Sequence, residues 1–152
     1  MKATDLQAAI GCAQLEKLDS FTAARRRNFA RLYEGLRDLP ELALFKQYPE
    51  ADPSWFGFLM TLAPEARCSR NDLVRHLEAK RIQTRNLFAG NLTRHPCFES
   101  LREGADYRVA GGLETTDNIM NNAFWIGLYP GMTDEKLDYM IETIRRFVKE
   151  EE

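Results

Sequence analysis

The stretch FWIGLYPGMT, residues 124–133, decides how the rest of the chain is interpreted. Its first six residues are largely apolar and are followed at once by Pro130 and Gly131, which is typical of a buried strand that ends in a turn. Thr133 can then cap a helix, because apolar side chains recur after it at the spacing of one helix face. These side chains are Leu137, Met140, Ile141, Ile144, Phe147 and Val148. The stretch predicts a strand, a tight turn and a helix with one buried face.

Three further segments have the aromatic and apolar content that favours strands. They are residues 43–48, 55–62 and 82–88, the first two separated by a turn-rich segment at 49–54. Ser69 and Asp72 stand in the positions of a helix cap and its acidic partner, which predicts a short helix that ends near Arg81. A second short helix is expected over residues 116–123, with Asp117 near the positive end of the helix dipole.

The N-terminal segment is expected to be helical. Thr4 and Gln7 have the spacing of a capping box, and apolar residues recur at helical spacing until Pro40 ends the pattern. The pattern predicts either one helix of about 35 residues or two helices with a break near residues 20–22. A helix this long more often bridges two domains than belongs to one small domain.

The predicted order is helix, strand, strand, helix, strand, a long irregular stretch at 89–112, helix, strand and helix. This order predicts an α+β fold in which helices pack on a small, mainly antiparallel sheet. The aromatic residues of the strands expected at 55–62 and 124–129 are assigned to its core, namely Trp55, Phe56, Phe58, Phe124 and Trp125. Residues 150–152 are expected to form a solvated acidic tail.

The composition is that of a globular chain and excludes several functions. The 152 residues include 21 Lys and Arg and 23 Asp and Glu, so the formal net charge is −2. This balance gives no attraction to nucleic acid, and the one basic run, residues 25–27, is interpreted as a solvated or interface face of a helix. No apolar run approaches the roughly 20 residues of a membrane span, and the N-terminus lacks the features of a secretory signal. The expected location is the cytoplasm.

Residues that often carry chemistry give few signals. Cys12, Cys68 and Cys97 are scattered, so we expect free thiols and no metal site. His76 is assigned a structural position in its helix, whereas His95 in the irregular stretch is kept as a weaker site candidate. The common phosphate-binding, nucleophile-elbow and zinc-protease motifs are absent, and no catalytic residue is assigned to this chain.

The most informative segment is TRNLFAGNLTRHP, residues 84–96. Its strand would bring Arg85 and Phe88 to one end, and the turn after them would present Asn91 and Arg94. Guanidinium groups bind phosphates and carboxylates, and amides bind sugar hydroxyls, so the segment suits an anionic, hydroxyl-rich ligand. A surface loop whose arginines pair with acidic side chains explains the same pattern equally well.

Four segments of the sequence resemble one enzyme family. KATDLQAAIGCAQLEKLDSF (2–21) is similar to a segment of the DegT/DnrJ/EryC/StrS sugar aminotransferases and dehydrases, which have fold type I of the pyridoxal-phosphate enzymes. DPSWFGF (52–58), TRNLFAGNLTRHP (84–96) and TDNIMNNAFWIGLYPGMT (116–133) resemble the CDP-4-keto-6-deoxyglucose 3-dehydrase branch, which serves the synthesis of lipopolysaccharide O-antigens. The resemblance covers nearly the whole chain.

The resemblance implies that the chain is the C-terminal part of a polypeptide more than twice as long. Residues 1–38 would be the end of its large domain and the inter-domain connection, and residues 39–152 would be its small domain. Pyridoxal or pyridoxamine phosphate, the Lys or His at the Schiff-base position and the cysteines of a [2Fe-2S] cluster would lie upstream, so none of these groups is expected to be bound here. The parent would be a homodimer served by an iron–sulfur flavin reductase.

The function implied by the resemblance is C3 deoxygenation of CDP-4-keto-6-deoxyglucose. By position, Arg85, Phe88, Asn91 and Arg94 would help to close the substrate site, and the chain alone would be inactive. The branch commonly has Gln at the position of His95, so no role for His95 follows. A nucleotide-sugar aminotransferase is the second interpretation, and a binding or interaction module that shares only the fold is the third.

Overall fold

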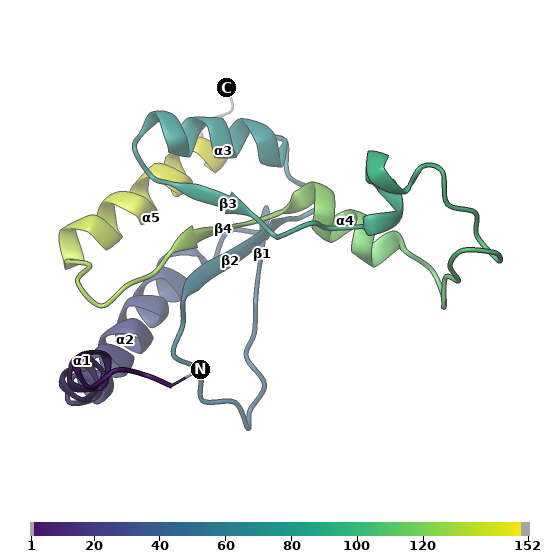
Figure 1. Cartoon of the computed structure of the whole chain (residues 1–152). Coiled ribbons are helices and arrows are strands. Elements are labelled where there is room, and N and C mark those ends of the chain that lie inside the picture. Colours follow the sequence, from purple (N-terminus) through teal and green to yellow (C-terminus); the bar gives the residue numbers. More distant parts are fainter. Residues whose placement is uncertain (1, 150–152) are drawn as a thin grey trace.

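The computed structural model describes residues 2–149, so the predicted tail at 150–152 lies outside the described residues. Figure 1 shows the arrangement of its helices and strands. In chain order they are α1 (Asp5–Leu15), α2 (Leu18–Leu36), β1 (Leu42–Leu44), β2 (Gly57–Leu62), α3 (Arg70–Ala79), β3 (Thr84–Asn86), α4 (Glu114–Asn122), β4 (Ala123–Gly127) and α5 (Asp134–Lys149). Two short 3-10 helices, η1 (Leu92–Arg94) and η2 (Pro96–Phe98), lie between β3 and α4.

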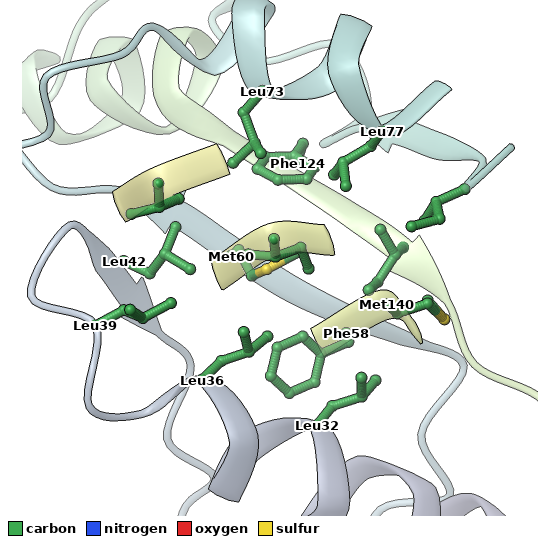
Figure 2. Close-up of a cluster of buried hydrophobic side chains, with 14 of the residues drawn as sticks. Leu32, Leu36, Leu39, Leu42, Phe58, Met60, Leu73, Leu77, Phe124 and Met140 are labelled. Atoms are coloured by element: carbon green, nitrogen blue, oxygen red, sulfur yellow. The ribbon is translucent and has the colours of Figure 1, made fainter. Parts of the chain in front are cut away.

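The strands form one antiparallel sheet in the order β1-β2-β4-β3. β2 and β4 lie at its centre, where Phe58 pairs with Ile126 and Met60 pairs with Phe124. Helices α2, α3 and α5 supply the buried side chains that pack on one face of this sheet (Figures 1 and 2). The architecture confirms the predicted α+β fold with helices on an antiparallel sheet.

The core follows from two periodicities. Side chains alternate between the faces of a strand, so Phe58, Met60 and Leu62 of β2 are buried while their neighbours are only half-buried. Leucines four residues apart on a helix share one face, as Leu32 and Leu36 do on α2. Figure 2 shows these leucines meeting the β2 side chains across the interface.

The aromatic residues of the central strands divide between the two faces of the sheet, which corrects their joint assignment to the core. Phe58 and Phe124 are buried under the helices, whereas Phe56 is 72% exposed. Trp125 points to the face opposite that of Phe124, and its ring centroid lies 5.2 Å from that of Phe56. A Cβ on Gly57 would lie 2.5 Å from the Trp125 ring, so only glycine leaves room for this indole.

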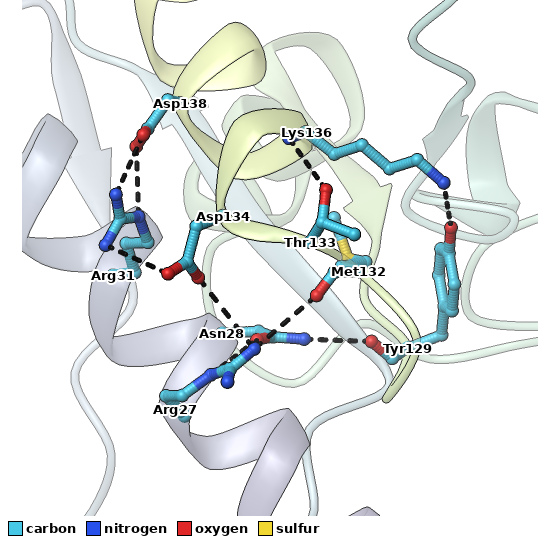
Figure 3. A network of polar contacts seen from close by, with 9 residues as sticks. All are labelled: Arg27, Asn28, Arg31, Tyr129, Met132, Thr133, Asp134, Lys136 and Asp138. Carbon is cyan, nitrogen blue, oxygen red and sulfur yellow. Dashed lines mark hydrogen bonds and ion pairs between the residues drawn. The ribbon is translucent and has the colours of Figure 1, made fainter.

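Polar contacts fasten α2 to the turn between β4 and α5 (Figure 3). The buried Asn28 donates from Nδ2 to the Tyr129 carbonyl oxygen at 2.9 Å. One turn later, Arg31 forms two hydrogen bonds with the Asp138 carboxylate, at 3.0 and 2.8 Å. These contacts hold α2 and α5 in a fixed position relative to each other.

The N-terminal segment contains two helices, and their junction lies earlier than residues 20–22, where a break was expected. The capping box at the start of α1 is present, as predicted. The break falls at residues 16–17, because the Lys17 carbonyl already accepts the amide of Phe21 within the first turn of α2. Residues 20–22 therefore continue that helix.

Helix α1 lies at the N-terminal end of α2, away from the sheet (Figure 1). It is apolar around much of its circumference, yet none of its residues is buried. Leu6 is 74% exposed, Ile10 57% and Leu15 68%. A helix with this composition normally packs against protein on more than one side.

The remaining predicted elements are confirmed with shifted limits. Ser69 caps α3 by accepting the amide of Asp72 at 3.2 Å, and Thr133 accepts the amide of Lys136 at 3.4 Å at the start of α5. The strands are shorter than expected, because residues 45–48, 55–56, 82–83, 87–88 and 128–129 lie outside them. Within residues 2–149, no helix combines the length and apolar character needed to cross a membrane.

Candidate functional site

Strand β3 leads into the segment that was predicted to bind a ligand. Thr84 donates from its amide and its hydroxyl to Glu78 Oε1, at 2.6 and 2.8 Å, which ties the strand to α3. These two hydrogen bonds lower the pKa of the Glu78 carboxyl. The next residue, Arg85, pairs with Trp125 across the sheet and is exposed.

Phe88 and Gly90 shape the turn after β3. Both are left-handed, with φ of +46° and +68°. This backbone conformation is rare for a large side chain, and the Phe88 ring is 88% exposed. A Cβ on Gly90 would lie 2.4 Å from the Met120 side chain, so the backbone there packs directly against α4.

Asn91 and Arg94 meet at Asp117 of α4. Asn91 is buried, and its Nδ2 donates to Asp117 Oδ1 at 2.6 Å while its Oδ1 accepts the amide and hydroxyl of Thr93. The Arg94 guanidinium pairs with Asp117 Oδ2 at 3.0 Å. Hydrogen bonds from Arg94 and then from Asn91 lower the pKa of the Asp117 carboxyl. Asp117 therefore clamps the loop to α4.

The five predicted site residues do not form one cluster. His95 closes the same loop, since its Nε2 hydrogen-bonds to the Ala89 carbonyl oxygen. Asn91, Arg94 and His95 thus belong to the clamped loop, whereas Arg85 lies on the strand before it and Phe88 projects into solvent. The binding role of all five stays a prediction.

A pocket of about 890 Å³ lies beside β3, at the end where the chain arrives from α3. It is lined by the face of the sheet opposite helices α2, α3 and α5, by the turn between α3 and β3, and by the first half of α5. Its aromatic lining consists of Phe56, Trp125, Tyr129 and Tyr139. Tyr139 donates its hydroxyl to the Lys80 carbonyl oxygen at 3.1 Å, which holds the turn against α5.

Four cationic residues line this pocket, Lys80, Arg81, Arg85 and Lys136. Among residues 2–149, none of them has a carboxylate within ion-pair distance. Glu135 is the acidic residue of the lining, and hydrogen bonds from its own amide and from the Thr133 hydroxyl lower the pKa of its carboxyl. The pocket therefore presents unbalanced positive charge.

Sequence reasoning identified only Arg85 among the cations of this pocket. Lys80 and Arg81 follow α3 while Lys136 lies on α5, and nothing in the sequence indicates that these elements meet. One sequence signal for Arg81 was present, because it stands directly after a helix, at the position where glycine is usual. Its backbone is left-handed, with φ of +61°.

A protein-family model, the DegT/DnrJ/EryC1/StrS aminotransferase family, matches residues 1–145. The chain belongs to this family. Among curated DegT relatives, the dTDP-4-dehydro-2,6-dideoxy-D-glucose 3-dehydratase of Saccharopolyspora spinosa is 49% identical over 148 residues, covering 97% of this chain and 31% of that protein. The lipopolysaccharide biosynthesis protein RfbH of Salmonella typhimurium is 47% identical over 151 residues, covering 97% and 33%. The chain spans about a third of these relatives and corresponds to their C-terminal part.

Solved DegT structures share the fold. A GDP-4-keto-6-deoxy-D-mannose-3-dehydratase from E. coli with bound hydrated PLP has a TM-score of 0.77 and 27% identity, covering 91% of this chain and 34% of that one. A structure of a GDP-4-keto-6-deoxymannose-3-dehydratase with a trapped PLP-glutamate geminal diamine has a TM-score of 0.76, 26% identity and the same coverage. These matches confirm the predicted fold type I small domain.

A pocket for pyridoxal phosphate needs a lysine or its substitute at the aldehyde carbon and a partner, often an Asp, for the pyridine nitrogen. The described lining of the pocket beside β3 contains no Asp. In the pocket beside β3 the Glu135 carboxylate is engaged at the start of α5, and Lys136 Nζ hydrogen-bonds to the Tyr129 hydroxyl at 3.4 Å (Figure 3). The described residues also contain no group of three or more His, Cys, Asp or Glu that could hold a metal ion.

Proposed function

We propose that this chain is the C-terminal part of a nucleotide-sugar 3-dehydratase that depends on pyridoxal or pyridoxamine phosphate and deoxygenates C3 of CDP-4-keto-6-deoxyglucose. The observation that carries the 3-dehydratase activity is the 49% identity to a curated dTDP-sugar 3-dehydratase over 97% of the chain. The CDP-linked substrate is proposed from the resemblance of residues 52–58, 84–96 and 116–133. The 47% identity to RfbH supports a place in lipopolysaccharide synthesis, and we extend this proposal to O-antigen sugars.

A nucleotide-sugar aminotransferase is the second candidate, because the matching family model is named for aminotransferases. The dehydratase is favoured over it, since a 3-dehydratase is 49% identical to this chain over 148 aligned residues, whereas the EryC1 protein of Saccharopolyspora erythraea is 27% identical over 143. The two reactions differ in whether the C3 hydroxyl departs or an amine is transferred to the sugar.

In this proposal residues 39–152 form the small domain, and residues 1–38 form the end of the large domain and the connection. The loop after β3 closes over the nucleotide sugar. Arg85 and Phe88 would contact it directly, because both side chains are exposed. Arg94 keeps unused donors although it pairs with Asp117, since its side chain is 63% exposed.

Asn91 would support substrate binding through the shape of the loop, because its side-chain amide is already used within the chain. His95 would act in the same way through its hydrogen bond to Ala89. Neither residue is proposed to take part in proton transfer.

The parent protein would be a cytoplasmic homodimer that holds its cofactor and a [2Fe-2S] cluster outside this chain. When bound, the pyridine ring of the cofactor supplies an electron sink for bond cleavage at the sugar. A flavin reductase would supply electrons through the cluster. Cys12, Cys68 and Cys97 form no disulfides and are not proposed as cluster ligands.

The test uses the purified full-length protein, CDP-4-keto-6-deoxyglucose, a reductase and its reductant, with the product analysed by mass spectrometry. The expected product lacks the C3 oxygen, and parallel reactions with dTDP- and GDP-linked sugars compare the bases. Glutamate-dependent gain of an amine without deoxygenation would establish the aminotransferase instead. Recovery of unchanged sugar in every reaction would overturn both.

The 152-residue chain by itself is proposed to be inactive. Titration with pyridoxal phosphate, followed by absorbance, is expected to show no stoichiometric internal aldimine. A specific aldimine on a single lysine, located by borohydride reduction and peptide mapping, would contradict the proposal that the cofactor is held elsewhere.

A further inference from the structure

We infer that the pocket beside β3 binds the nucleoside diphosphate group of a nucleotide sugar. The inference rests on the proposed function for the identity of the ligand and on the pocket for its chemistry. It assigns a place to the half of the substrate that does not react, apart from the loop at residues 88–95.

The charge of the pocket favours a diphosphate. Lys80, Arg81 and Lys136 line it without any ion pair among the described residues, in a chain whose net charge is −2. Several arginines elsewhere do pair with carboxylates, as Arg31 does with Asp138. Cations that line a concave site with no internal partner strengthen one another's attraction for an anion.

Arg85 adds a fourth positive group to the same wall. It lies close enough to Glu78 to contribute to the lowered pKa of that carboxyl. Glu78 Oε1 is nevertheless occupied by both donors of Thr84, and no ion pair forms between Glu78 and Arg85. The guanidinium therefore remains available to a phosphate oxygen.

Arg81 is held in a backbone conformation that its side chain does not favour. The amide of Ile82 donates to the Leu77 carbonyl oxygen and that of Arg81 to Glu78, the hydrogen bonds of a helix end that normally has glycine in the left-handed position. A strained position occupied by a cation points to a use for that cation. Arg81 is one of the residues that line the pocket.

The aromatic lining suits the base. The Phe56 and Trp125 rings lie 5.2 Å apart at 50° to each other on the face of the sheet opposite helices α2, α3 and α5, where a planar base can stack. The volume of about 890 Å³ falls within the roughly 300–1,000 Å³ typical of small-molecule sites. Tyr139 and Tyr129 are fixed by hydrogen bonds to Lys80 and Lys136, so the opposite wall is already formed.

Strand β3 connects this pocket with the loop of the proposed function. Arg85 lines the pocket, and the chain reaches Phe88 three residues later. A nucleotide sugar lying along β3 would place its diphosphate near the cations and its sugar near the loop.

The test measures the dissociation constant of CDP for the purified full-length protein by calorimetry, with dTDP, GDP and inorganic pyrophosphate as comparison ligands. Arg81→Gly removes the guanidinium and relieves the left-handed strain, so we expect CDP to bind about tenfold more weakly while the Tm stays equal or rises. Lys136→Gln should also weaken binding. Arg102→Gly, in the exposed loop before α4, is the matched control and should leave binding unchanged.

Equal affinity of CDP for the wild type and for Arg81→Gly would overturn the inference. Pyrophosphate that binds as tightly as CDP would also overturn it, because the base would then contribute nothing to the affinity. In turnover assays CDP should compete with the nucleotide sugar, and non-competitive inhibition would contradict the assignment. CDP binding that depends on Arg81 in a protein that neither deoxygenates nor aminates sugars would refute the proposed function alone. Deoxygenation unaffected by Arg81→Gly would refute the pocket alone.

Discussion

Leu32 connects the helical layer to the sheet through a single side chain. It is fully buried on α2, and Figure 2 shows it beside Phe58 of β2. Leu32→Ala would remove buried methyl groups and leave a cavity, so we expect a loss of about 3–5 kcal/mol in the free energy of unfolding, measured by urea denaturation. Leu92→Ala is the matched control, since Leu92 is 55% exposed and its loss should stay within about 0.5 kcal/mol. Similar losses for both variants would contradict the position of the core.

The ion pair between Asp38 and Arg145 makes stability depend on pH. Hydrogen bonding from Arg145 lowers the pKa of the Asp38 carboxyl from 3.8 to about 2. A carboxyl whose pKa is depressed in the folded state stabilises that state above its unfolded pKa, and this contribution is lost as pH falls through the folded pKa. The difference in Tm between wild type and Asp38→Asn should therefore be constant above about pH 5 and shrink as the pH falls toward 2.

A double-mutant cycle with Arg145→Gln serves as the control for this pair. The coupling between the two substitutions should vanish over the same pH range, because only the ionised carboxylate attracts the guanidinium. A coupling that persists at pH 2 would show that packing, and not charge, joins the two residues.

At the scale of elements, the loop between β3 and α4 is joined to α4 at Asp117, which accepts hydrogen bonds from both Asn91 and Arg94. Asp117→Asn removes the charge, so we expect faster hydrogen exchange in a peptide covering residues 88–96 with little change in the global Tm. The matched control is Asp106→Asn, which breaks an exposed pair with Arg102 in the distal part of the same loop. Unchanged exchange at 88–96 would show that Asp117 is not the clamp.

The elements that could be predicted from sequence are those fixed by local physics. Ser69 accepts a neighbouring amide, and the apolar spacing of α5 requires one buried face, so both helices were identified. The junction at residues 16–17 was missed because nothing buried marks it. Whether Trp125 is buried depends on which face of the sheet the helices cover. The pocket beside β3 exists only because α3 and α5 lie close together. Neither arrangement follows from the local spacing of residues. Asn91 was recognised as important, but its partner Asp117 lies 26 residues away.

At the scale of the whole molecule, α1 is the exposed apolar surface that stands out. Leu6 and Ile10 present apolar area that no described residue covers. Since exposed apolar helices seek burial, we expect the isolated chain to self-associate, as measured by light scattering over a range of concentrations. The double variant Leu6→Gln, Ile10→Gln should shift it toward monomer, whereas Tyr48→Gln, at a residue 76% exposed in a loop, should not. A monodisperse wild-type monomer with α1 ordered would contradict this expectation.

The pairing of α2 with α5 also bears on how the protein is made. Asn28 and Arg31 emerge from the ribosome early in this segment, but the groups that they hold, at Tyr129 and Asp138, are translated about a hundred residues later. β2 likewise cannot form the centre of the sheet until β4, its pairing partner, has been translated. Such long-range closure makes folding slow and leaves apolar surface uncovered in the nascent chain. A chain that ends before α5, after a stop codon or a ribosome stall, would therefore stay incompletely folded. Chaperones would bind it and proteases would degrade it, and it would not form a smaller folded domain.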